Sequence, residues 1–123
     1  MVKNALEKNP VVKLAFEFSL LIIEYCERLD EEKKFVVARQ LLRAGTSVCS
    51  SIIEAQNSES KADFIHKFKI AAKEAGEAEY WLWLCQYSKN YPTCDHLLLK
   101  IDSLNKMIGK IISTSKLRPK SNA

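Results

Sequence analysis

Residues 64–84 read FIHKFKIAAKEAGEAEYWLWL, and this stretch decides the fold of the 123-residue chain. Its apolar residues recur every three or four positions, which is the spacing of a helix that buries one face. Carboxylates interrupt the pattern, because Glu79 falls within the apolar arc and Glu74 and Glu77 lie beside it. A carboxylate on a packing face is costly unless it is paired. The stretch therefore predicts a helix whose acids need partners.

The composition favours a single helical domain. A hydrophobic fraction of 47% and a charged fraction of 28% are those of an ordinary globular protein, and 123 residues suffice for one core. Only three glycines and three prolines are present, too few for the many turns of an all-strand fold.

Periodicity predicts four helices, over residues of about 10–29, 31–56, 61–90 and 95–114. Asn9 before Pro10 is typical of a helix start, since the side chain can cap and the proline needs no donor there. Asp30 and the two glutamates after it suit the start of the second helix, where negative charge meets the positive end of the dipole.

The third helix starts with a cap from Ser58 or Ser60, and Asp63 completes a capping box with the latter. Pro92 prevents this helix from continuing. The connections are short, so the sequence predicts an all-α, antiparallel up-down-up-down four-helix bundle over residues 1–115. Residues 116–123 have the composition of a flexible basic tail.

Two helices have unusual surfaces. The first is apolar around about two thirds of its circumference, which indicates a second interface beyond the core. The second contains AGTSVCSS at residues 44–51, a run of small side chains that favours close packing over a ligand site.

The sequence gives no reason to expect a metal, a cofactor or a membrane span. The four cysteines are widely separated and are expected to be free, buried thiols. Cys85, Cys94 and His96 match no usual zinc spacing and supply only three ligands. The longest apolar run, residues 14–23, is too short to cross a bilayer and contains Glu17. With no export signal at the start, a cytoplasmic location is expected.

Two blocks resemble a known family: QLLRAGTSVCSSIIEA at 40–55 and FIHKFKIAAKEAGEAEYWLWL at 64–84. They are similar to the signature blocks of the four-helix-bundle proteins encoded within intervening sequences of bacterial 23S rRNA genes, the S23 ribosomal protein family. The matching positions are Arg43, Ala44, Ser47, Val48 and Glu54 in the first block and Lys73, Glu74, Ala75, Glu77, Tyr80, Trp81 and Leu82 in the second. Ala55 and Gln56 replace the small residues that usually follow the acid of the first block.

This resemblance extends over essentially the whole chain and implies a fold and an oligomer more firmly than an activity. Such proteins resemble the accessory protein of diversity-generating retroelements, a barrel-like homopentamer that engages nucleic acid together with a reverse transcriptase. The resemblance therefore implies a homopentameric ring.

RNA binding by a basic surface is the first functional hypothesis. From His96 onward six basic residues face only Asp102, a net charge of +5 against +4 for the whole chain. A symmetric oligomer would multiply this charge, and phosphate contacts supply much of the affinity for nucleic acid. The candidate RNA-binding residues are Arg39, Arg43, Lys100, Lys106, Lys110, Lys116, Arg118 and Lys120.

A scaffold or adaptor that docks a protein partner without nucleic acid is the alternative. It draws on the apolar first helix and on four aromatic residues expected at the surface, Tyr80, Trp83, Tyr87 and Tyr91. Catalysis is not expected, because the three glutamates share one helix with no acidic helix opposite and no Glu-x-x-His motif is present.

The acids are expected to have a structural role. Arg39 and Arg43 are their natural partners, since a guanidinium can engage a carboxylate through two hydrogen bonds. Both arginines point away from the apolar arc of their own helix, so we expect some pairs to cross a subunit boundary. The candidate structural or subunit contacts are Arg43, Glu54, Glu74, Glu77, Glu79 and Trp81.

Overall fold

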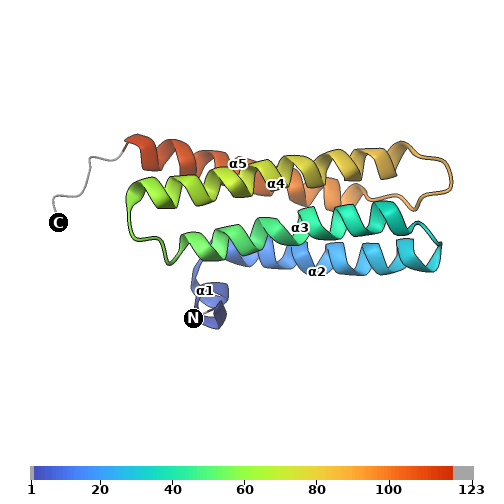
Figure 1. Cartoon of the computed structure of the whole chain (residues 1–123), viewed down its shortest axis with the longest axis horizontal. Helices are drawn as coiled ribbons and strands as arrows, with labels where there is room; N and C mark the ends of the chain where they lie inside the picture. The colour runs from blue at the N-terminus through green and yellow to red at the C-terminus, as the bar shows by residue number, and fades with distance from the viewer. Residues whose placement is uncertain (1, 118–123) are drawn as a thin grey trace.

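Five helices and no strand make up residues 2–117, the part of the chain that this computed structural model describes. They are α1 (Val2–Lys8), α2 (Pro10–Glu31), α3 (Phe35–Ala55), α4 (Lys61–Tyr87) and α5 (Asp95–Leu117). The four long helices run back and forth, with α2 and α3 in one layer and α4 and α5 in the other (Figure 1). Contacts between α2 and α5 close the bundle. The predicted all-helical bundle is confirmed, with one helix more than expected.

The predicted caps are present at two of the helix starts. Asn9 Oδ1 accepts hydrogen bonds from the backbone N–H groups of Val11 and Val12, at 3.2 and 3.4 Å. Ser60, and not Ser58, caps α4, because its Oγ accepts from the Asp63 N–H at 3.0 Å. Both side chains satisfy donors that the first turn of a helix leaves unpaired.

The predicted start of the second long helix was wrong. Helix α2 continues through Asp30 to Glu31, and α3 begins only at Phe35, with no side-chain cap. Lys33 adopts a left-handed conformation with φ of 64°, and the next N–H, of Lys34, donates to the Leu29 carbonyl at 2.8 Å. This bonding closes the end of α2 in the way that a glycine usually does. The acids therefore lie at the end of one helix and not at the start of the next.

Other boundaries differ by a few residues. Helix α4 ends at Tyr87, three residues before the predicted position, and Asn90 in the turn has a left-handed φ of 67°. Helix α5 continues to Leu117, so Lys116 is helical and not part of a tail. The rest of the predicted tail, residues 118–123, lies outside the described residues.

Helix α1 was not predicted, and it has no buried residue that would give a periodic signal. It projects from the end of the bundle where α2 begins (Figure 1). A small hollow between α1 and the end of α3 is lined by Val2, Ala5, Ile53, Gln56 and Asn57.

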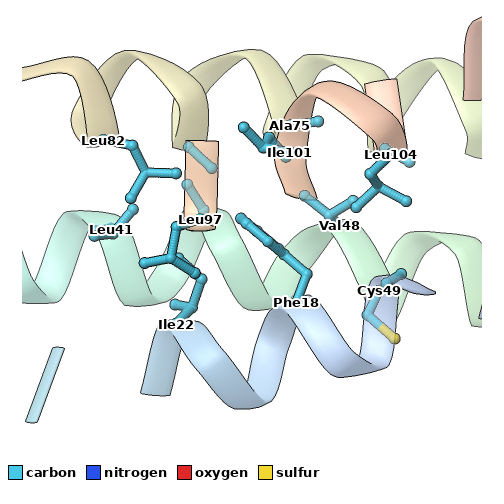
Figure 2. Packing of buried hydrophobic residues seen from close by; sticks show 14 of the residues in the cluster. Phe18, Ile22, Leu41, Val48, Cys49, Ala75, Leu82, Leu97, Ile101 and Leu104 are labelled. Atoms are coloured by element: carbon cyan, nitrogen blue, oxygen red, sulfur yellow. The ribbon is translucent and has the colours of Figure 1, made fainter. Parts of the chain in front are cut away.

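Side chains from all four long helices meet in one core (Figure 2). Its largest fully buried members include Phe18 and Ile22 from α2, Leu41 from α3, Leu82 from α4, and Leu97, Ile101 and Leu104 from α5. Gly45 of α3 lies where α2 comes closest, since an added Cβ would be 2.9 Å from two atoms of Ile22. The prediction that the small residues of this segment serve close packing is confirmed.

All four cysteines are free and buried, as predicted. Burial raises the pKa of the Cys26 thiol to about 12 and that of Cys94 to about 11. The Cys94 thiol contacts the Leu82 carbonyl at 3.3 Å, and the Tyr25 hydroxyl donates to the Pro92 carbonyl at 2.6 Å. These bonds attach the α4–α5 connection to the core.

Residues 2–117 contain neither a metal-binding cluster nor a membrane-spanning helix. No group of three or more His, Cys, Asp or Glu side chains in this range could hold a metal ion. None of its helices is both long and apolar enough to cross a membrane.

Candidate nucleic-acid interface

Arg43 on α3 is occupied by two carboxylates of α4. Its Nη1 lies 3.2 Å from Glu74 Oε2, and its Nη2 is paired with Glu77 Oε1. The hydrogen bond from Arg43 holds the pKa of Glu77 below its usual value. Both pairs lie within one chain, so Arg43 engages these two carboxylates without another subunit. The reason is that α3 and α4 pack side by side with Arg43 at the edge between them, where its half-exposed side chain reaches the acids of α4. That some pairs cross a subunit boundary stays a prediction.

The other predicted acids have different partners. Glu54 pairs with Lys67 of α4 at 3.6 Å. Glu79 pairs with no arginine among residues 2–117 and accepts from Asn105 Nδ2 of α5 at 2.9 Å and from Trp83 Nε1 at 3.3 Å. The predicted guanidinium partner is therefore right for Glu74 and Glu77 and wrong for Glu79, which lies on the α5 side of its helix.

Trp81 is half-buried, and its Nε1 is buried without a hydrogen-bond partner within residues 2–117. The nearby Glu77 carboxylate is the acceptor toward which this N–H is directed, since Trp81 is, after Arg43, among the groups that lower the pKa of Glu77. A subunit contact at Trp81 stays a prediction.

Two of the predicted RNA-binding lysines are in ion pairs. Lys100 lies 3.2 Å from Glu17 of α2 and so connects α5 to α2. Lys106 lies 3.0 Å from Asp102 one turn earlier, but both side chains are mostly exposed. Such surface pairs are weak and screened by salt, so Lys106 keeps its ability to meet another anion.

Lys110 and Lys116 are exposed and make no ion pair within residues 2–117. Arg39 is likewise exposed but lies on α3, in the other layer. The last two predicted residues, Arg118 and Lys120, fall outside the described part of the chain.

Sequence reasoning missed two lysines of α4, Lys69 and Lys73, which are exposed and without an ion pair in the described structure. The contact between Glu79 and Asn105 sets the antiparallel register of α4 and α5. Moving back along α4 from this contact therefore corresponds to moving forward along α5. Lys69 and Lys73 thus lie at the same end of the layer as the lysines near the end of α5.

These five residues form what we call the lysine surface: Lys69, Lys73, Lys106, Lys110 and Lys116. No acid occurs in residues 64–73 or 103–117, so both segments carry net positive charge. The acids nearest to them on the same helices are Glu77, which interacts with Lys73, and Asp102, which pairs with Lys106. A lysine ammonium on a flexible stem is a point charge suited to phosphate. Lys69 and Lys73 could have been found from the sequence, because no acid occurs in residues 64–73.

The opposite layer has a different surface. Leu20 and Ile23 of α2 and Leu42 of α3 are exposed, Leu20 to 51%. We call these three residues the apolar surface. Leu20 and Ile23 belong to the first predicted helix, whose apolar residues outnumber those that the core needs. A sufficiently large exposed apolar patch indicates an interaction site.

Comparison with known proteins shows the family of this chain. The model of the family described as 23S rRNA-intervening sequence protein matches residues 7–110. The chain is also similar to a crystal structure of a protein with unknown function from the S23 ribosomal protein family of Bacteroides thetaiotaomicron VPI-5482. The two are 39% identical with a TM-score of 0.79, over 83% of this chain and 97% of that chain. None of the curated proteins compared matches this chain.

Proposed function

Since the chain belongs to the 23S rRNA-intervening sequence protein family, the S23 ribosomal protein family, we propose that it is a non-catalytic, homo-oligomeric protein that binds RNA. The family supplies the fold and no activity, because the similar crystal structure is itself of a protein with unknown function. The function has to be argued from the surface of this chain.

One observation supports RNA binding above the rest: the five exposed lysines of the lysine surface belong to two helices that pack against each other, and all lie on one side of the contact between Glu79 and Asn105. Like charges on one surface repel one another in the free protein, and a polyanion relieves the repulsion. Each phosphate that a lysine neutralises also releases a condensed counterion, which makes binding favourable and dependent on salt. Arg43 and Lys100, in contrast, are paired with carboxylates of the same chain.

The test is RNA binding measured by fluorescence anisotropy over a range of salt concentrations. A labelled RNA should bind at low salt, and log K should fall linearly with log salt. Replacing Lys69, Lys73, Lys110 and Lys116 with glutamine should reduce the slope by about 0.7 for each single-strand phosphate contact that is lost.

Lys13→Gln supplies the matched control, because Lys13 is exposed on α2 in the other layer. It removes one positive charge, as Lys110→Gln alone does, and should leave the slope unchanged. If the parent protein fails to bind RNA at low salt, or if Lys13→Gln weakens binding as much as Lys110→Gln does, the proposal is wrong.

The proposed oligomer is a homopentamer, as the resemblance implied. What supports self-association in this chain is the apolar surface, since burial of exposed leucine and isoleucine on a second copy would remove them from water. Light scattering should give a mass of about five chains. Leu20→Lys should dissociate the assembly without lowering helix content, whereas a parent protein of one-chain mass would refute self-association.

The alternative function is a scaffold that docks a protein partner without nucleic acid. The observation in its favour is that three predicted surface aromatics, Tyr80, Trp83 and Tyr87, are indeed exposed, whereas Tyr91 is half-buried. Tyrosine and tryptophan are enriched at protein interfaces. Recovery of a protein partner from cells after nuclease treatment, with no binding to RNA in the anisotropy assay, would favour this function.

A further inference from the structure

The lysine surface continues into a set of exposed aromatic rings on the same side of α4. The relevant positions are Lys69, Lys73, Gly76, Tyr80, Trp83 and Tyr87, each three or four residues after the previous one, so they form one stripe along the helix. All are exposed, and Tyr87 is 82% exposed. Lysines occupy the first half of the stripe and aromatics the second.

The rings in the aromatic half of the stripe are held in a fixed orientation before any ligand binds. The rings of Trp83 and Tyr87 are stacked, with centroids 5.9 Å apart and an angle of 23° between their planes. The indole of Trp83 is further held by its hydrogen bond to Glu79, which in turn accepts from Asn105 of α5. Two large rings are thus presented to solvent in a restrained orientation, although the core of the chain does not need them.

Between the two halves the surface is open. Gly76 of α4 and Gly109 of α5 each lie about one helical turn from the contact between Glu79 and Asn105, on the same side of it. A Cβ added at either glycine would have no atom within 4 Å. A chain-like ligand could therefore pass from the lysines to the aromatic rings without meeting a side chain at either glycine.

We propose that this side of α4 and α5 binds single-stranded RNA, with phosphates on the lysine surface and bases stacked on Trp83 and Tyr87. The inference rests on the proposed RNA-binding function. It adds the class of RNA and the residues that contact its phosphates and its bases. Single strands can splay their bases onto aromatic side chains, whereas the bases of a duplex are already stacked inside the helix.

Charge gives the strand a preferred arrangement. Glu79 and Asp95 lie in the half of the layer that holds the aromatic rings and make no ion pair within residues 2–117, and Gln86 holds Asp95 through a hydrogen bond of 2.6 Å. Glu74 and Glu77, which adjoin the lysine half, are paired with Arg43. Glu79 and Asp95 disfavour phosphate in the aromatic half but leave neutral base faces unaffected. The backbone is therefore directed to the lysine half. From Lys69 to Tyr87 the stripe is about 27 Å long at 1.5 Å per residue, enough for several nucleotides.

The experiment compares a 12-nucleotide RNA of alternating cytidine and adenosine with a 12-base-pair RNA duplex. In a Trp81→Phe background, where Trp83 is the one remaining tryptophan, the single strand should quench the fluorescence and the duplex should not. In the parent protein, Trp83→Leu together with Tyr87→Leu should weaken single-strand binding by about 10-fold or more and leave duplex binding unchanged. Circular dichroism verifies that each variant is folded.

Two controls accompany these variants. Trp83→Phe with Tyr87→Phe retains aromatic faces and should retain most of the affinity. Phe35→Leu removes an exposed ring from α3, in the other layer, and should have no effect.

The outcomes separate this inference from the function on which it rests. Equal affinity for both RNAs that depends on the lysines but not on Trp83 and Tyr87 would overturn the inference alone. So would a protein partner that is lost on Trp83→Leu while RNA binding is unchanged. Absence of binding to either RNA at low salt would overturn the proposed function as well.

Discussion

Substitution of Gly45 by alanine provides a direct measurement of how closely α2 and α3 pack. The new Cβ would lie 2.9 Å from Cγ1 and from Cγ2 of Ile22 and 3.3 Å from its Cδ1. Carbon atoms prefer a separation of about 3.5 to 4.0 Å, so at least two atoms of Ile22 would have to move by more than half an ångström. Ile22 is fully buried, and a β-branched side chain has essentially one χ1 rotamer in a helix.

The change in the free energy of unfolding on Gly45→Ala is the difference between two opposing effects. Overpacking a filled core costs about 1 to 3 kcal/mol, and two clashes on a restrained side chain favour the upper end. Alanine in a helix interior recovers about 1 kcal/mol relative to glycine. Gly45→Ala should therefore destabilise the fold by about 1 to 2 kcal/mol. The matched controls are Gly76→Ala and Gly109→Ala, which meet no atom within 4 Å and should each stabilise by about 1 kcal/mol.

Urea denaturation followed by circular dichroism gives these free energies, provided that the slope with denaturant stays constant. A background substitution shows whether Ile22 is the cause. Ile22→Val keeps both Cγ atoms and should not relieve the effect, whereas Ile22→Ala removes them, so that Gly45→Ala should become stabilising in that background. If Gly45→Ala is as stabilising as Gly76→Ala in the parent protein, the packing argument is refuted.

Three further predictions concern buried and paired groups. Tyr25→Phe should destabilise the fold by about 1 to 3 kcal/mol, since it leaves the buried Pro92 carbonyl without its donor; an unchanged denaturation midpoint would contradict this. Because Arg43 lowers the pKa of Glu77 in the folded state, this pair stabilises the fold above pH of about 4.5, and the contribution is lost as the pH falls through the lowered pKa. Glu77→Gln should therefore lower the melting temperature at pH 7 but not at pH 2, and an equal loss at both would exclude the ion pair as the cause. A thiol reagent at pH 8 should label none of the four cysteines quickly in the folded protein and all four in urea, because burial protects them and raises the pKa of Cys26 to about 12; rapid labelling of the folded protein would show that the core opens.

Much of the fold could be predicted from the sequence, because periodicity and capping are local. Asn9 and Ser60 cap the helices that they were expected to cap, and the small residues near Gly45 serve close packing. The start of the second long helix was mispredicted, because acidic residues favour a helix start without requiring one. A left-handed conformation at Lys33, which glycine would have signalled, ends α2 instead.

Less of the candidate site could be predicted, since it depends on which helices lie beside each other. Arg43 and Lys100 carry the same charge as Lys110 in the sequence, but in the fold each has a carboxylate from a neighbouring helix beside it. Lys69 was missed because the sequence does not show which other lysines the fold brings near it. It is 48 residues from Leu117, the end of α5, in sequence and joins the lysine surface only through the antiparallel packing of α4 and α5.

The arrangement of surfaces bears on how assembly and RNA binding can coexist in one small protein. The apolar surface belongs to the layer of α2 and α3, and the lysines and exposed aromatics belong to the layer of α4 and α5 (Figure 1). A self-association that buries Leu20 and Leu42 would therefore leave the lysine surface of every copy exposed. Several identical surfaces on one assembly engage one RNA with greater avidity than a single surface can, provided that the RNA spans them. The modest charge of a single chain would then suffice, because assembly multiplies it without covering it.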